Sequence, residues 1–282
     1  MGIYSDILLT VDFDRTLTGP DAVVPERNIE AIAYFMANGG KFTVNTGRST
    51  STFGKYLNTF PVNAPLLLYN GSAAWENGRL THSVPIELDV WQTMDTVRRL
   101  FPGVNLEIQG VDTHYLIDPS SELTALYDKL GWQYQIAQQG QDVGPFLKFA
   151  CIDTPQKPAV SAFYECDESR KRYFDRIEQT LRSVLGETCE VFRACPLIVD
   201  IHAKGVSKIN AARRLQAELG RRILVCVGDA ENDIPMLDGA DFAFCPADSV
   251  VAERYENVCP CGAGAVADVI YKKIPEILAN QP

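Results

Sequence analysis

The stretch ILLTVDFDRTLT, residues 7–18, decides the fold of this chain. From Ile7 to Val11 it is apolar or β-branched without interruption, which is typical of a strand buried on both faces of a parallel sheet. Asp12 and Asp14 follow directly. Alternate residues of an extended backbone point to the same side, so both carboxylates are expected at the carboxyl end of the strand, where open α/β sheets bind ligands.

Two neighbouring carboxylates repel each other unless a cation or a shared proton relieves them. Magnesium binding combined with covalent catalysis would explain why Asp12 and Asp14 stand side by side. The alternative is that these acidic residues only cap the turn that follows the strand. The other motifs of the chain have to decide between the two interpretations.

The order of the next elements predicts a doubly wound parallel sheet. The pattern indicates a helix over residues 25–38, strands over 41–45 and 65–69, and a short helical stretch between these strands. Such alternation is typical of an α/β, Rossmann-like core with right-handed crossovers. Asn77-Gly78 predicts a hairpin at the edge of that sheet.

The pattern changes in the middle of the chain, where helices and strands with polar faces alternate. The core pattern then returns with a helix over 207–219 and a buried strand over 223–227. We therefore predict a core domain made of residues 1–83 and 197–282, with an α+β cap domain of residues 84–196 inserted into it.

Composition argues against several classes of protein. The 282 residues carry a formal net charge of -10, which argues against binding to the phosphate backbone of nucleic acids. No apolar run is long enough for a membrane span, and the first acidic motif comes too early for a signal peptide. The eight cysteines lack zinc-site spacing. We predict a reduced, cytoplasmic protein and make no prediction about its oligomeric state.

Thr46-Gly47 and Lys208 are candidates for binding a phosphate. A threonine hydroxyl followed by a glycine N–H can hold phosphate oxygens, although Thr-Gly after a strand is often only a turn. A lysine at the start of a helix is electrostatically misplaced unless it serves an anion bound there. Lys204 is the rival candidate for this role, and a surface position is the simpler interpretation of either lysine.

The segment GDAEND, residues 228–233, is the most informative of these motifs. A buried strand ends in Gly228-Asp229 and turns at once into Asn232 and Asp233, which gathers three oxygen-bearing side chains at the carboxyl edge of the sheet. Hard oxygen ligands in this arrangement suit Mg²⁺. Helix capping alone would account for one of the three residues.

DFDRT, NTG, GVSK and GDAEND, in this order and separation, resemble the four motifs of the haloacid dehalogenase (HAD) superfamily of phosphatases. The insertion resembles the α+β (type IIB) cap of the Cof-like branch, which includes relatives of sucrose-phosphatase and phosphomannomutase. Arg15 departs from this pattern, because close relatives usually have glycine there, and Asn45 stands where alanine is common.

The resemblance implies a role for each motif residue. Asp12 would be the nucleophile that accepts the phosphoryl group, and Asp14 the general acid and base. Mg²⁺ would be held by the Asp12 carboxylate, the Asp14 backbone carbonyl and Asp229. The remaining residues would act on the phosphoryl group: Thr46, Gly47, Lys208 and Asn232 would bind it, while Asp233, with Asn232, would orient Lys208 and the waters of the metal.

The expected activity is hydrolysis of small phosphorylated metabolites, with sugar phosphates as the substrate class that the family suggests. Two alternatives stay open: a phosphomutase of the same fold, and a phosphoaccepting signalling module. Asp14 argues against the signalling module, because a general acid beside the nucleophile speeds turnover. Five polar residues lie near predicted strand ends of the insertion, and we interpret each as solvated or structural: Glu107, His114, Lys148, Arg193 and Asp200.

Overall fold

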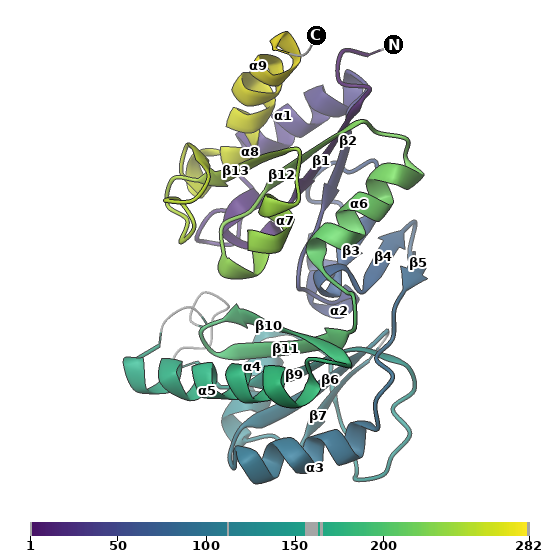
Figure 1. Cartoon of the computed structure of the whole chain (residues 1–282), viewed down its shortest axis with the longest axis vertical. Helices are drawn as coiled ribbons and strands as arrows, with labels where there is room; N and C mark the ends of the chain where they lie inside the picture. Colours follow the sequence, from purple (N-terminus) through teal and green to yellow (C-terminus); the bar gives the residue numbers. More distant parts are fainter. Residues whose placement is uncertain (1, 112, 156–162, 164–165, 281–282) are drawn as a thin grey trace. The chain divides into compact units, whose positions relative to one another are not determined.

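The computed structural model describes residues 2–111, 113–155, 163 and 166–280, and the chain forms two compact units (Figure 1). The core unit comprises Met1–Gly47, Lys55–His82 and Ser207–Pro282, and the inserted unit comprises Arg48–Gly54 and Ser83–Val206. No helix among the described residues is long and apolar enough to cross a membrane.

The core unit is built on a parallel sheet of five strands in the order β14-β13-β12-β1-β2. Its strands are β1 (Ile7–Val11), β2 (Lys41–Val44), β12 (Ile223–Val227), β13 (Phe242–Pro246) and β14 (Glu256–Val258). All five residues of β1 are buried, as expected for a central strand covered on both faces. The predicted α/β fold with a parallel sheet is confirmed.

Helices cover both faces of this sheet (Figure 1). They are α1 (Glu26–Ala37), α6 (Lys208–Glu218), α7 (Ile234–Asp238), α8 (Ala265–Asp268) and α9 (Ile274–Ala279). α1, α8 and α9 lie on one side, and α6 and α7 on the other (Figure 1). On the second side Leu215 and Met236 belong to one apolar cluster with Leu8 and Leu224 of the sheet. Burial of these side chains from water holds the layers together.

A small antiparallel sheet extends the core unit. It consists of β3 (Leu66–Leu68), β4 (Ala73–Glu76) and β5 (Arg79–Ser83). Asn77 and Gly78 have φ angles of 51° and 82°, as the tight primed turn between two strands requires, so the predicted hairpin is confirmed. The sequence pattern placed residues 65–69 in the parallel sheet, whereas β3 pairs antiparallel with β4 and adjoins the end of β2 through a parallel bridge between Asn45 and Leu67.

The inserted unit contains a sheet of six strands in the order β10-β11-β9-β6-β7-β8. These strands are β6 (Asn105–Gly110), β7 (His114–Ile117), β8 (Gln135–Ile136), β9 (Phe146–Ile152), β10 (Cys189–Cys195) and β11 (Ile198–Ala203). The helices of the unit are α2 (Thr50–Phe53), α3 (Val90–Leu100), α4 (Ser121–Leu130) and α5 (Glu168–Leu185). β11 pairs with both β9 and β10, so residues 198–206 lie with the inserted unit, whereas the sequence pattern predicted that the core resumes at residue 197.

The two faces of this sheet differ in chemistry. One face packs against α3 and α5 through an apolar cluster that includes Met94, Ile108 and Phe174. Alternation along the strands puts polar side chains on the opposite face, which we call the buried polar face: Glu107, Gln109, His114, Lys148, Asp200 and His202. All six residues are buried. Four of them were expected to be either solvated or structural, and burial excludes the solvated alternative for Glu107, His114, Lys148 and Asp200.

The burial of His202 leads to a prediction of how the stability of the inserted unit depends on pH. Burial lowers the pKa of His202 from 6.5 to about 3, with a further contribution from the charge of Lys148. Between these two values the unfolded chain binds a proton that the folded chain does not, so stability falls as the pH falls. We expect this residue alone to remove about 1.4 kcal/mol of unfolding free energy per pH unit below pH 6.5.

Thermal unfolding of wild type and His202→Gln between pH 6.5 and 4.5 measures this effect. The variant should have a shallower dependence of stability on pH. Equal slopes for the two proteins would contradict the assignment of a buried, neutral His202.

Candidate functional site

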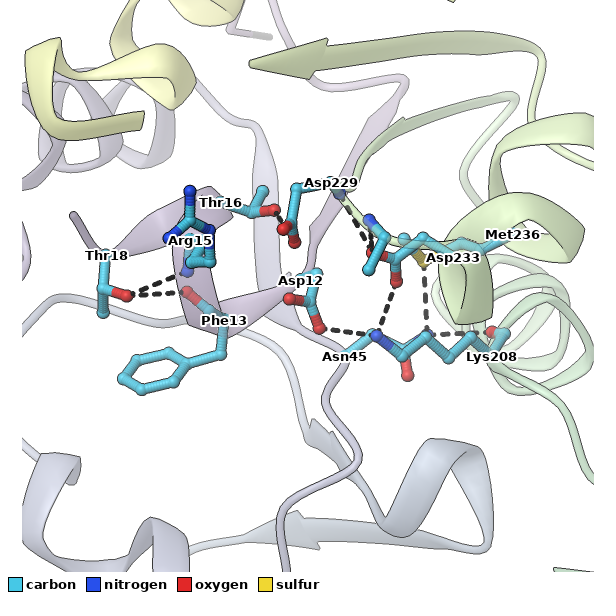
Figure 2. A network of polar contacts seen from close by, with 11 residues as sticks. Asp12, Phe13, Arg15, Thr16, Thr18, Asn45, Lys208, Asp229, Asp233 and Met236 are labelled. Atoms are coloured by element: carbon cyan, nitrogen blue, oxygen red, sulfur yellow. Dashed lines mark hydrogen bonds and ion pairs between the residues drawn. The ribbon is translucent and has the colours of Figure 1, made fainter. Parts of the chain in front are cut away.

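The carboxyl ends of β1 and β12 bring Asp12 and Asp229 to the same edge of the sheet (Figure 2). Val11 pairs with Val227, and the Asp12 backbone N–H donates to the Val227 carbonyl at 2.8 Å. Both strands therefore end in register, and Asp229 follows a glycine directly after β12. The two side chains are buried, with relative exposures of 7% and 5%.

Lys208 joins this edge from the start of α6. Its Nζ lies 2.5 Å from Oδ1 of Asp12 and 2.6 Å from Oδ1 of Asp233 (Figure 2). Ser207 caps the helix by accepting from the Asn210 N–H, and Asn45 donates from Nδ2 to the Lys208 carbonyl at 2.8 Å. The lysine is 3% exposed, so its ammonium is held by carboxylates and not by bulk water.

Asp233 is held by hydrogen bonds to both of its carboxylate oxygens. Oδ1 accepts from Lys208, and Oδ2 accepts from the backbone N–H groups of Asp229 and Ala230 at 3.0 and 3.1 Å. This turn requires glycine at position 228, where a Cβ would lie 2.6 Å from the Cβ of Asp233. Asp233 is therefore held in place by the turn and in turn holds the Lys208 ammonium.

Asp229 and Asp12 each keep one oxygen outside these contacts. The hydroxyl of Thr16 donates to Oδ1 of Asp229 at 3.0 Å, and Lys208 occupies Oδ1 of Asp12 (Figure 2). Among the described residues, no hydrogen bond reaches Oδ2 of either side chain. Two carboxylate oxygens at the edge of the sheet are thus left for a ligand.

The charges of this cluster do not balance. Oxygen atoms of Asp12, Asp229 and Asp233 lie within 4.8 Å of one another, and three carboxylates with one ammonium leave a net charge of -2. Burial raises the pKa of Asp12 to about 7, the lysine opposes this, and Asp233 and Asp14 add to it. Burial and the neighbouring Asp12 raise the pKa of Asp229 as well.

A metal ion fits this donor set. A divalent cation would offset the excess charge and bind the two carboxylate oxygens that the protein leaves without a hydrogen bond. Burial lowers the pKa of Lys208, but the carboxylates of Asp12 and Asp233 outweigh it, so the ammonium keeps its proton. The cluster could therefore hold a metal beside a fixed positive charge.

The segment after Asp12 turns in a short helical stretch, Phe13–Leu17. Asp14 lies partly buried in it and close enough to Asp12 to raise the pKa of that residue. Arg15 has φ 59° and ψ 11°, the left-handed region that favours glycine. The turn after Asp12 therefore holds an arginine in a backbone conformation that glycine adopts more readily.

Thr46 and Gly47 follow β2, beside β1. The Asn45 N–H donates to the Val11 carbonyl at 2.8 Å, which brings this strand end to the same edge of the sheet. Thr46 is buried, its carbonyl accepts from the Asn70 N–H at 2.9 Å, and a Cβ at position 47 would lie 2.9 Å from Oδ1 of Asn70. The loop thus needs glycine for a close approach.

Two further candidate residues, Asn232 and Lys204, lie outside the described hydrogen bonds between Lys208 and the acidic cluster. Asn232 is half-buried in the turn Glu231–Asp233, and no described hydrogen bond joins it to Lys208 or Asp12. Lys204 is exposed in the inserted unit and donates to the Gly186 carbonyl at 2.7 Å. Of the two lysines considered, Lys208 is the one in contact with the acidic cluster.

Sequence reasoning missed Thr16 and Asn45 as parts of the site. Thr16 occupies the last position of the DFDRT motif, so its spacing from Asp12 was a usable signal. Asn45 shows only as a polar residue where relatives carry alanine, and its bond to the Lys208 backbone joins segments far apart in the chain. No local pattern indicates that bond.

The family model for haloacid dehalogenase-like hydrolases matches residues 9–252. The chain therefore belongs to this family, and the resemblance stated from its motifs is confirmed. An HMP-PP phosphatase of Shigella flexneri is 23% identical over 257 residues, covering 88% of this chain and 87% of the relative.

Two solved structures share the fold. SMU.1108c of Streptococcus mutans UA159 has a TM-score of 0.78 at 14% identity, covering 95% of this chain and 98% of the other. The HAD subclass IIB sugar phosphatase BT4131 has a TM-score of 0.73 at 19% identity, covering 96% and 99%. Both alignments include the core and inserted units over nearly their whole length.

Gly228→Ala tests the close packing of the turn. The new methyl group must displace Asp233 and with it the anchor of Lys208, so we expect a loss of about 1–3 kcal/mol of unfolding free energy. Denaturant unfolding measures the loss. Gly54→Ala is the matched control, because a Cβ at that position would have no atom within 4 Å and its φ is -51°. Equal stability of Gly228→Ala and wild type would contradict this packing.

Proposed function

We propose that this protein is a Mg²⁺-dependent phosphatase that hydrolyses small phosphorylated metabolites, with sugar phosphates as the substrate class, through an aspartyl-phosphate at Asp12. The observation that carries the proposal is the buried contact between Lys208 and Asp12 beside Asp229. A carboxylate held in place by a fixed ammonium is suited to in-line attack on a phosphoryl group, whose transfer depends on positioning and charge neutralisation.

In the first step, a carboxylate oxygen of Asp12 forms a bond to phosphorus, and the bond between phosphorus and the ester oxygen breaks. Asp14 donates a proton to the departing alcohol. In the second step Asp14 takes a proton from a water that attacks phosphorus, which releases inorganic phosphate and restores the Asp12 carboxylate.

The remaining residues position these groups. Lys208 offsets negative charge on the phosphoryl oxygens, and Asp233 orients its ammonium. Thr46 and the N–H of Gly47 bind phosphoryl oxygens, and Asn232 supports them from the turn after β12. The Asp12 carboxylate, the Asp14 carbonyl and Asp229 would hold Mg²⁺, which when bound adds positive charge against the phosphoryl oxygens.

The relatives support the choice of substrate class. One relative is named an HMP-PP phosphatase, and a structural neighbour is described as a sugar phosphatase. The net charge of -10 supports a small substrate drawn in by the local charges of the site, because the overall field repels anions.

Asp12→Asn should abolish phosphate release from a panel of phosphorylated sugars and other metabolites. The amide is a far weaker nucleophile than the carboxylate, so we expect a loss of at least about 10³-fold in kcat. Asp142→Asn, which removes an exposed carboxylate of the inserted unit, is the control and should be as active as wild type. Release by Asp12→Asn at the wild-type rate would exclude Asp12 as the nucleophile.

Mg²⁺ should stabilise the protein through Asp229. At a concentration of ten times Kd, binding to the folded state adds about 1.4 kcal/mol of unfolding free energy, seen as a higher Tm. Asp229→Asn should lose this gain, and excess chelator should remove it from wild type. A Tm gain of the same size in Asp229→Asn would place the ion elsewhere.

A further inference from the structure

The chain leaves the core unit directly after Thr46-Gly47. Residues Arg48–Gly54, which include α2, group with the inserted unit by their contacts, and the chain returns to the core unit at Lys55. A helix as short as α2, with four residues, has little stability of its own. Its position is therefore set by the groups that it contacts in the inserted unit.

Two side chains fasten this segment to the inserted unit. Oγ of Ser49 lies 2.7 Å from Nε2 of His114 on β7, and the hydroxyl of Thr50 donates to the Val111 carbonyl at 2.9 Å. Ser49 and His114 are each 1% exposed. Both contacts reach the β6–β7 hairpin.

Glu107 stands on the other side of the His114 ring. Its Oε1 lies 2.9 Å from Nδ1 of His114, and its Oε2 accepts from the Gln109 amide at 3.0 Å. Burial raises the pKa of Glu107, but His114 and Lys148 outweigh it, and the pKa falls to about 2. An ionised carboxylate beside Nδ1 keeps the other ring nitrogen directed at Ser49.

The contact with His114 is additional to the capping of α2. The Ser49 hydroxyl already accepts from the Thr52 N–H at 3.1 Å, and the Thr52 hydroxyl accepts from the Ser49 N–H at 3.1 Å. This capping box closes the helix start within the segment itself. The imidazole therefore does not serve the helix cap, and its effect is to tie the segment to β7.

We propose that His114 is a positioning residue for phosphoryl binding: by holding Ser49, it fixes the exit of the Thr46-Gly47 loop, with Glu107 fixing the ring. The inference rests on the proposed function, since it takes Thr46 and Gly47 as phosphate-binding groups. It gives part of the buried polar face a role in the reaction. Phosphate affinity then depends on a side chain that is distant in sequence from the Thr46-Gly47 loop.

Two substitutions of His114 separate its contacts. The amide of His114→Asn reaches the place of Nδ1, next to Glu107, and loses Ser49, whereas the longer amide of His114→Gln reaches the place of Nε2 and keeps Ser49. Calorimetric titration with inorganic phosphate in the presence of Mg²⁺ measures the affinity. We expect binding to weaken about tenfold in His114→Asn, the effect of one buried hydrogen bond, and to recover largely in His114→Gln.

Ile177→Val is the matched control for stability. Ile177 is fully buried in the apolar cluster on the opposite face of the sheet, and its loss of one methylene destabilises the inserted unit without touching Ser49. Phosphate affinity should be unchanged in this variant. Hydrogen exchange of the amides of residues 46–54 should accelerate in His114→Asn and stay at the wild-type rate in Ile177→Val.

Unchanged phosphate affinity in a folded His114→Asn, or an equal loss in Ile177→Val, would overturn the inference and leave the proposed function standing. Absence of phosphate binding by the wild type would remove both together. If His114→Asn does not fold, Thr50→Val removes the second fastening and should weaken binding about threefold. No change in that variant would also count against the inference.

Discussion

The ammonium of Lys208, buried between Asp12 and Asp233, is the interaction on which the site depends. Removing charges from water is unfavourable unless each is compensated, and one lysine does not compensate three clustered carboxylates. When all three carboxylates are ionised, the end of the central strand carries an excess of buried negative charge, and the raised pKa values of Asp12 and Asp229 reflect its cost. This excess gives the site its demand for a cation.

The fold meets this demand by placing each group at a point where the backbone has little freedom. β1 and β12 end in register, which aligns Asp12 with the start of the turn that carries Asp229. Gly228 lets Asp233 fold back close enough to accept two backbone N–H groups. Arg15 adopts a left-handed backbone conformation in the turn that follows Asp12, although it is not glycine.

The sequence predicts those features of the structure whose pattern lies within a few neighbouring residues. It does not predict contacts between segments that are far apart in the chain. A buried strand followed by a carboxylate marks Asp12 and Asp229 as residues of one sheet edge, and a cation at a helix start marks Lys208, because both signals are local. The pairing of Ser49 with His114 joins two segments about 65 residues apart in the chain, and periodicity carries no information about such register. For the same reason the polar residues of the insertion could not be recognised as one buried face.

The location of the bound ion tests the central claim most directly. Crystals soaked in Mn²⁺, as a stand-in for Mg²⁺ with measurable anomalous scattering, would show where the excess negative charge is neutralised. We predict one anomalous peak within about 2.0–2.3 Å of a carboxylate oxygen of Asp12 and of Asp229. A fully soaked crystal without a peak between these two side chains, or with its main peak elsewhere, would contradict the account.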